Sequence, residues 1–147
     1  MLVEVETVTE VTQEIYAAIC RLVRLLGAHK PIPSREDLTA LVESESSMLL
    51  VARTADNESQ ITGMLALSIY RVPTGIRSVV EDVVVDGSFR RQGVARALLG
   101  QAILRAKEAG ARNMSLTSRP DREAANQLYL SMGFQKRETN AYSLALE

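Results

Sequence analysis

Between residues 76 and 109 the chain passes from an apolar strand, through a short polar loop, into a helix. The run Val83–Val85 is β-branched and uninterrupted, which is typical of a strand buried on both faces. After Gly93 the apolar residues recur at helical spacing as far as Ala109, and Gly110 is a natural helix end. This change of period predicts a strand followed directly by a long helix.

The spacing of the apolar residues also predicts the other elements of the chain. Alternating or β-favouring residues predict strands at 2–8, 48–54, 61–72, 76–86, 112–118, 134–137 and 141–146. Apolar residues three and four apart predict helices at 11–27, 34–42, 93–109 and 120–132. Turn signals at Asp56-Asn57 and Pro73–Gly75 separate three sequential strands, Ser34 with Asp37 resembles a capping box, and Asp121 is the expected cap of the last helix. We expect one mixed α/β domain with about seven strands, mostly antiparallel, and about four helices.

Composition excludes several classes of protein. The 147 residues fit one domain, and 46% of them are hydrophobic, which is enough to bury a core. With 17 Lys and Arg against 18 Asp and Glu, the chain lacks the basic surface that nucleic acid requires. The single cysteine, Cys20, excludes an internal disulfide framework, and with His29 as the single histidine we expect no metal site and no Ser-His-Asp triad.

The location of the protein is predicted from what its sequence lacks. Acidic residues stand near the beginning of the given sequence, where a signal peptide needs positive charge. No run of about 18 uncharged apolar residues is present to span a membrane. We therefore expect a soluble, cytoplasmic protein that does not bind membranes.

The loop before the long helix has the features of an anion-binding site. Free backbone N–H groups and the helix dipole favour negative charge at a helix start. Gly93 and Ala95 leave room for an anion, and Arg90, Arg91 and Arg96 add positive charge. The alternative is that Gly93 only permits a turn and that the arginines are solvated. The loop matches neither a Walker sequence nor the three-glycine dinucleotide fingerprint.

Two motifs carry a resemblance to a known family. Arg90-Arg91-Gln92-Gly93-Val94-Ala95 resembles the Arg/Gln-x-x-Gly-x-Gly/Ala signature of the GCN5-related N-acetyltransferase (GNAT) superfamily. The segment from Asn126 to Tyr129, followed by Gly133-Phe134, is similar to the C-terminal motif of that family. The resemblance is strongest over residues 48–146. It implies one GNAT-like domain over residues 1–147, with a twisted sheet that splays between its fourth and fifth strands.

The resemblance also implies a cofactor, acetyl-coenzyme A (acetyl-CoA), as co-substrate. Its pyrophosphate would lie on the backbone amides of Arg91–Arg96, and its pantetheine arm would pair with the main chain of the fourth strand. Asn126 would bond the arm or its solvent. The implied cofactor-binding residues are Val83, Val84, Val85, Arg90, Arg91, Gln92, Gly93, Val94, Ala95, Arg96 and Asn126.

Catalytic roles follow from the same resemblance. Tyr129 matches the tyrosine that protonates the departing thiolate, although a core aromatic would have the same pattern. Glu81 matches a strand-four glutamate that removes the amine proton, with Asp82 or an ordered water as alternatives and Asp82 also a substrate-binding candidate. Strand alternation predicts that Glu81 and Asp82 point to opposite faces. His29 lies where the family often builds its acceptor pocket, so it is a substrate-binding candidate.

The sequence therefore predicts an N-acetyltransferase that uses direct attack in a ternary complex. The acceptor stays open among a small amine metabolite, an amino sugar and a protein amine. A different acyl group, such as succinyl, is a second possibility. The alternative from another class is an acyl-CoA-binding sensor or assembly module without turnover. A homodimer is compatible with the family.

Overall fold

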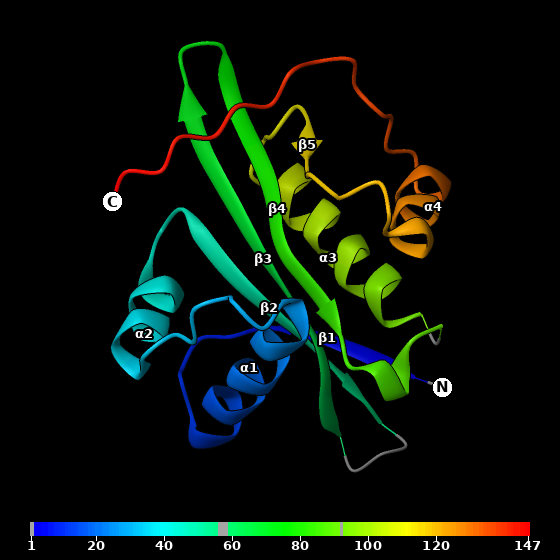
Figure 1. Cartoon of the computed structure of the whole chain (residues 1–147). Helices are drawn as coiled ribbons and strands as arrows, with labels where there is room; N and C mark the ends of the chain where they lie inside the picture. Colours follow the sequence, from blue (N-terminus) through cyan, green and yellow to red (C-terminus); the bar gives the residue numbers. More distant parts are fainter. Residues whose placement is uncertain (1, 56–58, 92) are drawn as a thin grey trace. The chain divides into compact units, whose positions relative to one another are not determined.

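The structure is a computed structural model that describes residues 2–55, 59–91 and 93–147 (Figure 1). The chain forms two compact units, Met1–Leu116 and Thr117–Glu147. The strands of the first unit are β1 (Val3–Thr7), β2 (Ser47–Thr54), β3 (Gln60–Val72), β4 (Gly75–Val85) and β5 (Met114–Ser115). Its helices are α1 (Gln13–Leu26), α2 (Arg35–Glu43), the short 3-10 helix η1 (Gly87–Phe89) and α3 (Val94–Glu108). The second unit contains α4 (Glu123–Ser131).

The sheet is mixed, as the spacing predicted. The described residues form one sheet with the strand order β1-β2-β3-β4-β5. The first four strands pair antiparallel with their neighbours, and β5 pairs parallel with β4 after the chain has crossed over through α3. The expected parallel step across the long helix is therefore confirmed. The predicted turn at Asp56-Asn57 lies outside the described residues.

The first two helices begin at side-chain caps. Thr12 Oγ1 accepts a hydrogen bond from the backbone N–H of Ile15 at 3.2 Å. Ser34 Oγ accepts from the Asp37 N–H at 3.0 Å, and the Asp37 carboxylate accepts from the Ser34 N–H at 3.4 Å. Each bond satisfies a helix-start donor that has no partner within the helix. The capping box predicted from Ser34 and Asp37 is confirmed.

Helices α1 and α2 pack on one face of the sheet (Figure 1). Their apolar residues form one buried cluster with apolar residues of the sheet. The helices contribute Ile19, Leu22 and Leu38 among others, and the sheet contributes Leu49, Met64 and Val84 among others. Cys20 is buried as well. Because side chains alternate along a strand, neighbouring residues such as Leu50 and Leu65 point to the opposite face. Helix α3 covers that face, and it contacts β1 through β4.

Gly63 on β3 determines how closely α3 approaches the sheet. A Cβ atom at this position would lie 2.9 Å from Val94 Cγ1 and 3.2 Å from Leu98 Cδ1. The first of these contacts is shorter than real Cβ atoms show and the second is tight, so a larger residue here would force these α3 side chains to shift. Gly63 therefore permits the close packing of the first turns of α3 on the sheet.

Two expected C-terminal strands are absent. Residues 134–147, all of which the structure describes, form no helix or strand, so the sheet of the described chain has five strands and not seven. The apolar residues of this segment are largely exposed to solvent: Tyr142 is 91% exposed, Leu144 82% and Leu146 92%. Alternation is a property of one segment, whereas a strand also requires a hydrogen-bonded neighbour, and spacing does not reveal whether that neighbour exists.

Three local predictions are also corrected. The fifth strand spans only Met114–Ser115, not residues 112–118. Helix α4 begins after Arg122, without a side-chain cap, so Asp121 is not its N-cap. Of Val83–Val85 only Val84 is buried, at 6% exposure, because helix α1 covers one face of this end of β4 and the opposite face is left partly open.

No helix in the described parts of the chain is long and apolar enough to cross a membrane.

Candidate functional site

The connection from β4 to α3 ends at a glycine whose conformation requires glycine. Gly93 has φ 82° and ψ 9°, in the left-handed region that side-chain-bearing residues rarely adopt. Its carbonyl accepts the first hydrogen bond of α3, from Ala97 N at 3.0 Å. A Cβ atom at Gly93 would meet no atom of the described residues within 4 Å. A side chain at this position would therefore point into open space, and the first N–H groups of α3 have no partner within the helix.

Exposed arginines surround this helix start. Arg90, Arg91 and Arg96 are all exposed, and Arg91 also has a positive φ of 64°. Neither Arg90 nor Arg91 forms an ion pair with a described residue, so both guanidinium groups can contact an added anion. Gln92 lies outside the described residues. Positive side chains and the helix dipole act together here to favour a phosphate-like group.

Asp86 fastens the beginning of this loop to two other elements. Its backbone N–H donates to Thr62 O at 2.8 Å, and its carboxylate accepts from Ser88 N at 3.1 Å. The same carboxylate forms an ion pair with Arg21 of α1. Arg21 also donates to the carbonyl of Ile61 at 2.9 Å. Arg21 and Asp86 are 65 positions apart, so no local pattern of the sequence indicates their pairing.

A β-bulge interrupts β4 at the two acidic residues. Glu81 pairs with Ala66 of β3, and Val84 pairs with Met64, so two β4 residues lie opposite one β3 residue. Asp82 adopts φ 51° to make the bulge. The extra residue breaks the regular alternation, and Glu81 and Asp82 are both exposed. The expectation that they occupy opposite faces was made for a regular strand; of the two, only Asp82 is among the residues that line the cavity described below.

The outer edge of β4 is largely unpaired. Strand β5 pairs with β4 only at Ser78 and Val79, through Met114 and Ser115. From Val80 to Val85 no described strand occupies this edge. Main-chain donors and acceptors of that stretch can therefore bond an extended, amide-containing ligand.

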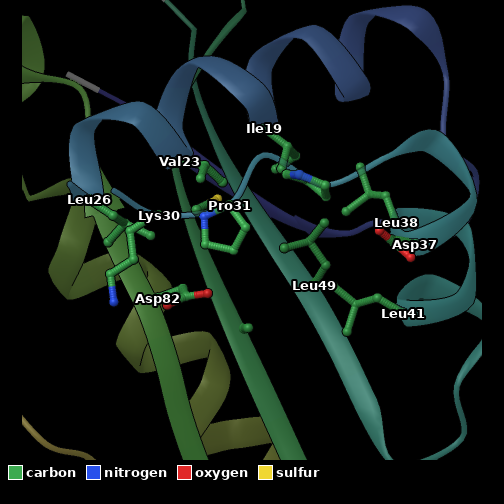
Figure 2. A pocket seen from close by; sticks show the side chains of 13 residues that line it. Ile19, Val23, Leu26, Lys30, Pro31, Asp37, Leu38, Leu41, Leu49 and Asp82 are labelled. Atoms are coloured by element: carbon green, nitrogen blue, oxygen red, sulfur yellow. The ribbon is translucent and has the colours of Figure 1, made fainter. Parts of the chain in front are cut away.

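A cavity of about 210 Å³ lies between α1, α2 and the sheet (Figure 2). Asp82 lines it together with Ala66 of β3 and residues of the α1–α2 connection. His29 is exposed on that connection and is not among the lining residues, whereas the adjacent Lys30 is. Glu81 does not line the cavity, although its partner Ala66 does. Its walls come from two helices, three strands and the α1–α2 connection, so no single segment of the sequence indicates the cavity.

The second unit contains the other two predicted site residues. Tyr129 of α4 is buried at 7% exposure, and its ring meets Phe134 edge-on with centroids 6.0 Å apart. Burial raises the pKa of the Tyr129 phenol, and the positive charge of Arg122 partly opposes the rise. Asn126 Nδ2 donates to the carbonyls of Arg119 at 2.9 Å and Arg122 at 2.7 Å. Asn126 therefore stabilises the start of α4 and keeps only its side-chain oxygen for another partner.

No group of three or more His, Cys, Asp or Glu residues in the described ranges is arranged to hold a metal ion.

The comparisons with known proteins agree with this geometry. The model of the acetyltransferase (GNAT) family matches residues 12–134, so the chain belongs to that family. The resemblance inferred from the two motifs is thereby confirmed, and an acyltransferase is the class that the family defines. No curated protein sequence matches the chain.

Solved structures show the same fold at low sequence identity. An aminoglycoside acetyltransferase from an uncultured soil metagenomic sample, in complex with trehalose, has a TM-score of 0.85 and 19% identity, with 99% of this chain and 97% of that chain covered. A transcriptional regulator from Bacillus halodurans C-125 has a TM-score of 0.80 and 23% identity, over 98% and 100% of the two chains. The acetyltransferase AAC(6')-Iy, in complex with the bisubstrate analog CoA-S-monomethyl-acetylneamine, has a TM-score of 0.77 and 18% identity, over 99% of each chain.

Proposed function

We propose that this protein is an N-acetyltransferase that transfers the acetyl group of acetyl-CoA to a primary amine in a ternary complex. The observation that carries the proposal is the open N-terminus of α3 at Gly93, next to the unpaired edge of β4, in a chain of the GNAT family. Backbone amides of Arg91–Arg96 bind the pyrophosphate, aided by the side chains of Arg90, Arg91 and Arg96. The main chain of Val83–Val85 binds the pantetheine arm.

Two residues of the chain carry out the proton transfers, one as the base and one as the acid. Acetyl-CoA supplies an activated thioester, and the amine must be neutral when it attacks. Glu81 accepts the amine proton, directly or through water, while Asp82 binds the amine at the cavity. A backbone N–H of β4 stabilises the charge that develops on the carbonyl oxygen as the C–N bond forms. Tyr129 donates its phenolic proton to the thiolate as the C–S bond breaks.

Calorimetric titration with acetyl-CoA tests the foundation of this proposal, with desulfo-coenzyme A as the control ligand. Micromolar binding of both ligands is expected, because the contacts of the α3 N-terminus are made to the pyrophosphate and not to the sulfur. A folded protein, shown to be free of copurified coenzyme A, that binds neither ligand would refute the proposal.

Glu81→Gln is expected to flatten the acid limb of the pH dependence of kcat/KM, because an amide cannot accept the amine proton. Asp82→Asn is expected to raise the KM for the amine while keeping that limb. Initial rates of thiol release across the pH range measure both effects. The reverse pattern would exchange the two roles, and an unchanged profile in both variants would leave the base role to water.

Arg21→Met is expected to weaken acetyl-CoA binding by roughly fivefold, which corresponds to about 1 kcal/mol. The physical reason is that the loop before α3 loses its connection to α1 through Asp86. Arg24→Met is the matched control, since Arg24 lies on the same helix, is exposed and forms no ion pair with a described residue. Equal affinities of the two variants would mean that the ion pair does not position the loop.

A binding module without turnover is the second candidate function. It is favoured by one observation, that a structure of the same fold is described as a transcriptional regulator. Release of thiol from acetyl-CoA in the presence of an amine distinguishes the two, because only the enzyme consumes the thioester.

A further inference from the structure

The cavity beside β4 is lined mainly by apolar side chains. Its lining residues are apolar apart from Lys30, Asp37 and Asp82. Leu38 and Leu41 of α2 and Leu49 of β2 line its α2 side (Figure 2). Walls of this kind favour a hydrocarbon group and leave the hydroxyl groups of a sugar without hydrogen-bond partners.

The two acidic residues of the cavity differ in what they already bind. The Asp37 carboxylate accepts a hydrogen bond from Ser34 N within the capping box of α2. The Asp82 carboxylate has no hydrogen bond or ion pair with any described residue, and the β-bulge holds Asp82 in the left-handed conformation. Figure 2 shows Asp82 and Lys30 toward one end of the cavity and Asp37 toward the other. Asp82 is therefore the acid available to a substrate cation.

The charged residues and the volume of the cavity limit the ligands that can bind in it. Asp82 can neutralise one ammonium group, while the nearby positive charge of Lys30 disfavours a polycation. Among engineered cavities, one of about 150 Å³ holds benzene. The present cavity, at about 210 Å³, has room for a phenyl ring with a short linker.

We propose that the acceptor is a small primary amine with a single positive charge and a compact apolar body, whose ammonium group binds Asp82 and whose body fills the cavity. The inference rests on the proposed function, since it specifies the substrate class of that site. On this proposal a polycationic amino sugar is not the acceptor.

The first arm of the test compares two probes that each have one amine and a six-membered ring, phenethylamine and glucosamine. The kcat/KM for phenethylamine is expected to be at least about tenfold higher, as is usual when a site is apolar. A higher value for glucosamine, or for a polycationic aminoglycoside, would overturn the substrate class while leaving the acetyltransferase activity intact.

The second arm fills the cavity. Ala66→Leu adds side-chain volume to a lining residue of β3, and it is expected to weaken phenethylamine binding at least about tenfold while ethylamine is unaffected. Ser68→Leu is the matched control, because Ser68 lies two residues further along β3 and does not line the cavity. Unchanged phenethylamine binding in folded Ala66→Leu would overturn the proposal. Leu41→Gln, on the half-buried side of α2, repeats the test if Ala66→Leu does not fold.

The third arm isolates the charge. Phenethyl alcohol has the same apolar body without the ammonium group, so the ratio of its Kd to that of phenethylamine reports the contribution of Asp82. The ratio is expected to be about tenfold in the wild type and near one in Asp82→Asn. A ratio that Asp82→Asn does not change would show that the ammonium group binds elsewhere.

Calorimetric Kd values keep this inference separate from the proposed function. If acetyl-CoA binds but no amine releases thiol, the enzyme proposal fails, and the binding ratios still test the cavity. If a longer acyl-CoA is preferred over acetyl-CoA and Ala66→Leu removes that preference, the cavity holds the acyl chain and the present proposal is wrong.

Discussion

Gly93→Val is expected to weaken acetyl-CoA binding by at least about 100-fold. Gly93 has φ 82°, and the left-handed conformation costs a residue with a side chain roughly 1–2 kcal/mol. A β-branched side chain would also occupy the open space in front of the α3 amides. Calorimetric titration with acetyl-CoA measures the loss, and thermal unfolding shows whether the variant is folded.

Gly100→Val is the matched control for this substitution. Gly100 lies within α3, has no positive φ, and a Cβ atom there would meet no atom of the described residues within 4 Å. The control is expected to keep wild-type affinity. If Gly93→Val also binds acetyl-CoA with wild-type affinity, the pyrophosphate does not lie at this helix start and the assignment of the site is wrong.

Tyr129→Phe is expected to lower kcat by about 100-fold or more while the Kd for acetyl-CoA stays unchanged. Phenylalanine keeps the ring that meets Phe134 and removes only the hydroxyl group. Because burial raises the pKa of Tyr129 above its ordinary value of about 10, the phenol is protonated throughout the neutral range and can act as an acid. Steady-state kinetics and calorimetry measure the two quantities.

The pH dependence of the wild type provides an independent check of this role. An acid must be protonated, so a rate limited by Tyr129 falls only as the pH rises past its raised pKa, and no loss from this group is expected near neutrality. Tyr142→Phe is the control, since Tyr142 is 91% exposed in the same unit. A Tyr129→Phe variant with wild-type kcat would make the tyrosine a packing residue of α4.

Local spacing was sufficient to predict much of this molecule. The change of period at Asp86–Gly93 located the end of β4, the start of α3 and the glycine between them, and Ser34 with Asp37 located the start of α2. These features depend on residues within a few positions of each other, so one segment carries the whole signal. The two family motifs are local in the same sense, and they identified the family that the comparison confirmed.

Predictions from regular spacing were incomplete where the conformation of a strand depends on its pairing with a neighbouring strand. Regular alternation was assumed across Glu81 and Asp82, where β4 contains an extra residue opposite β3. Near the end of the chain Tyr142, Leu144 and Leu146 occupy alternate positions, yet residues 134–147 form no strand in the described chain. In both cases the pairing partner, and not the segment, determined the conformation.

Length, composition and local pattern thus determined the class of fold, the start of α3 after Gly93 and the family. Tertiary structure alone decided the connection of Asp86 to Arg21, the cavity that Asp82 lines, and the number of strands. Arg21 and Asp86 are 65 residues apart, and the cavity takes its walls from helices and strands that meet only when the chain folds. Such contacts join residues that carry no common local pattern, which is why the cavity and the residues that line it became accessible only from the folded chain.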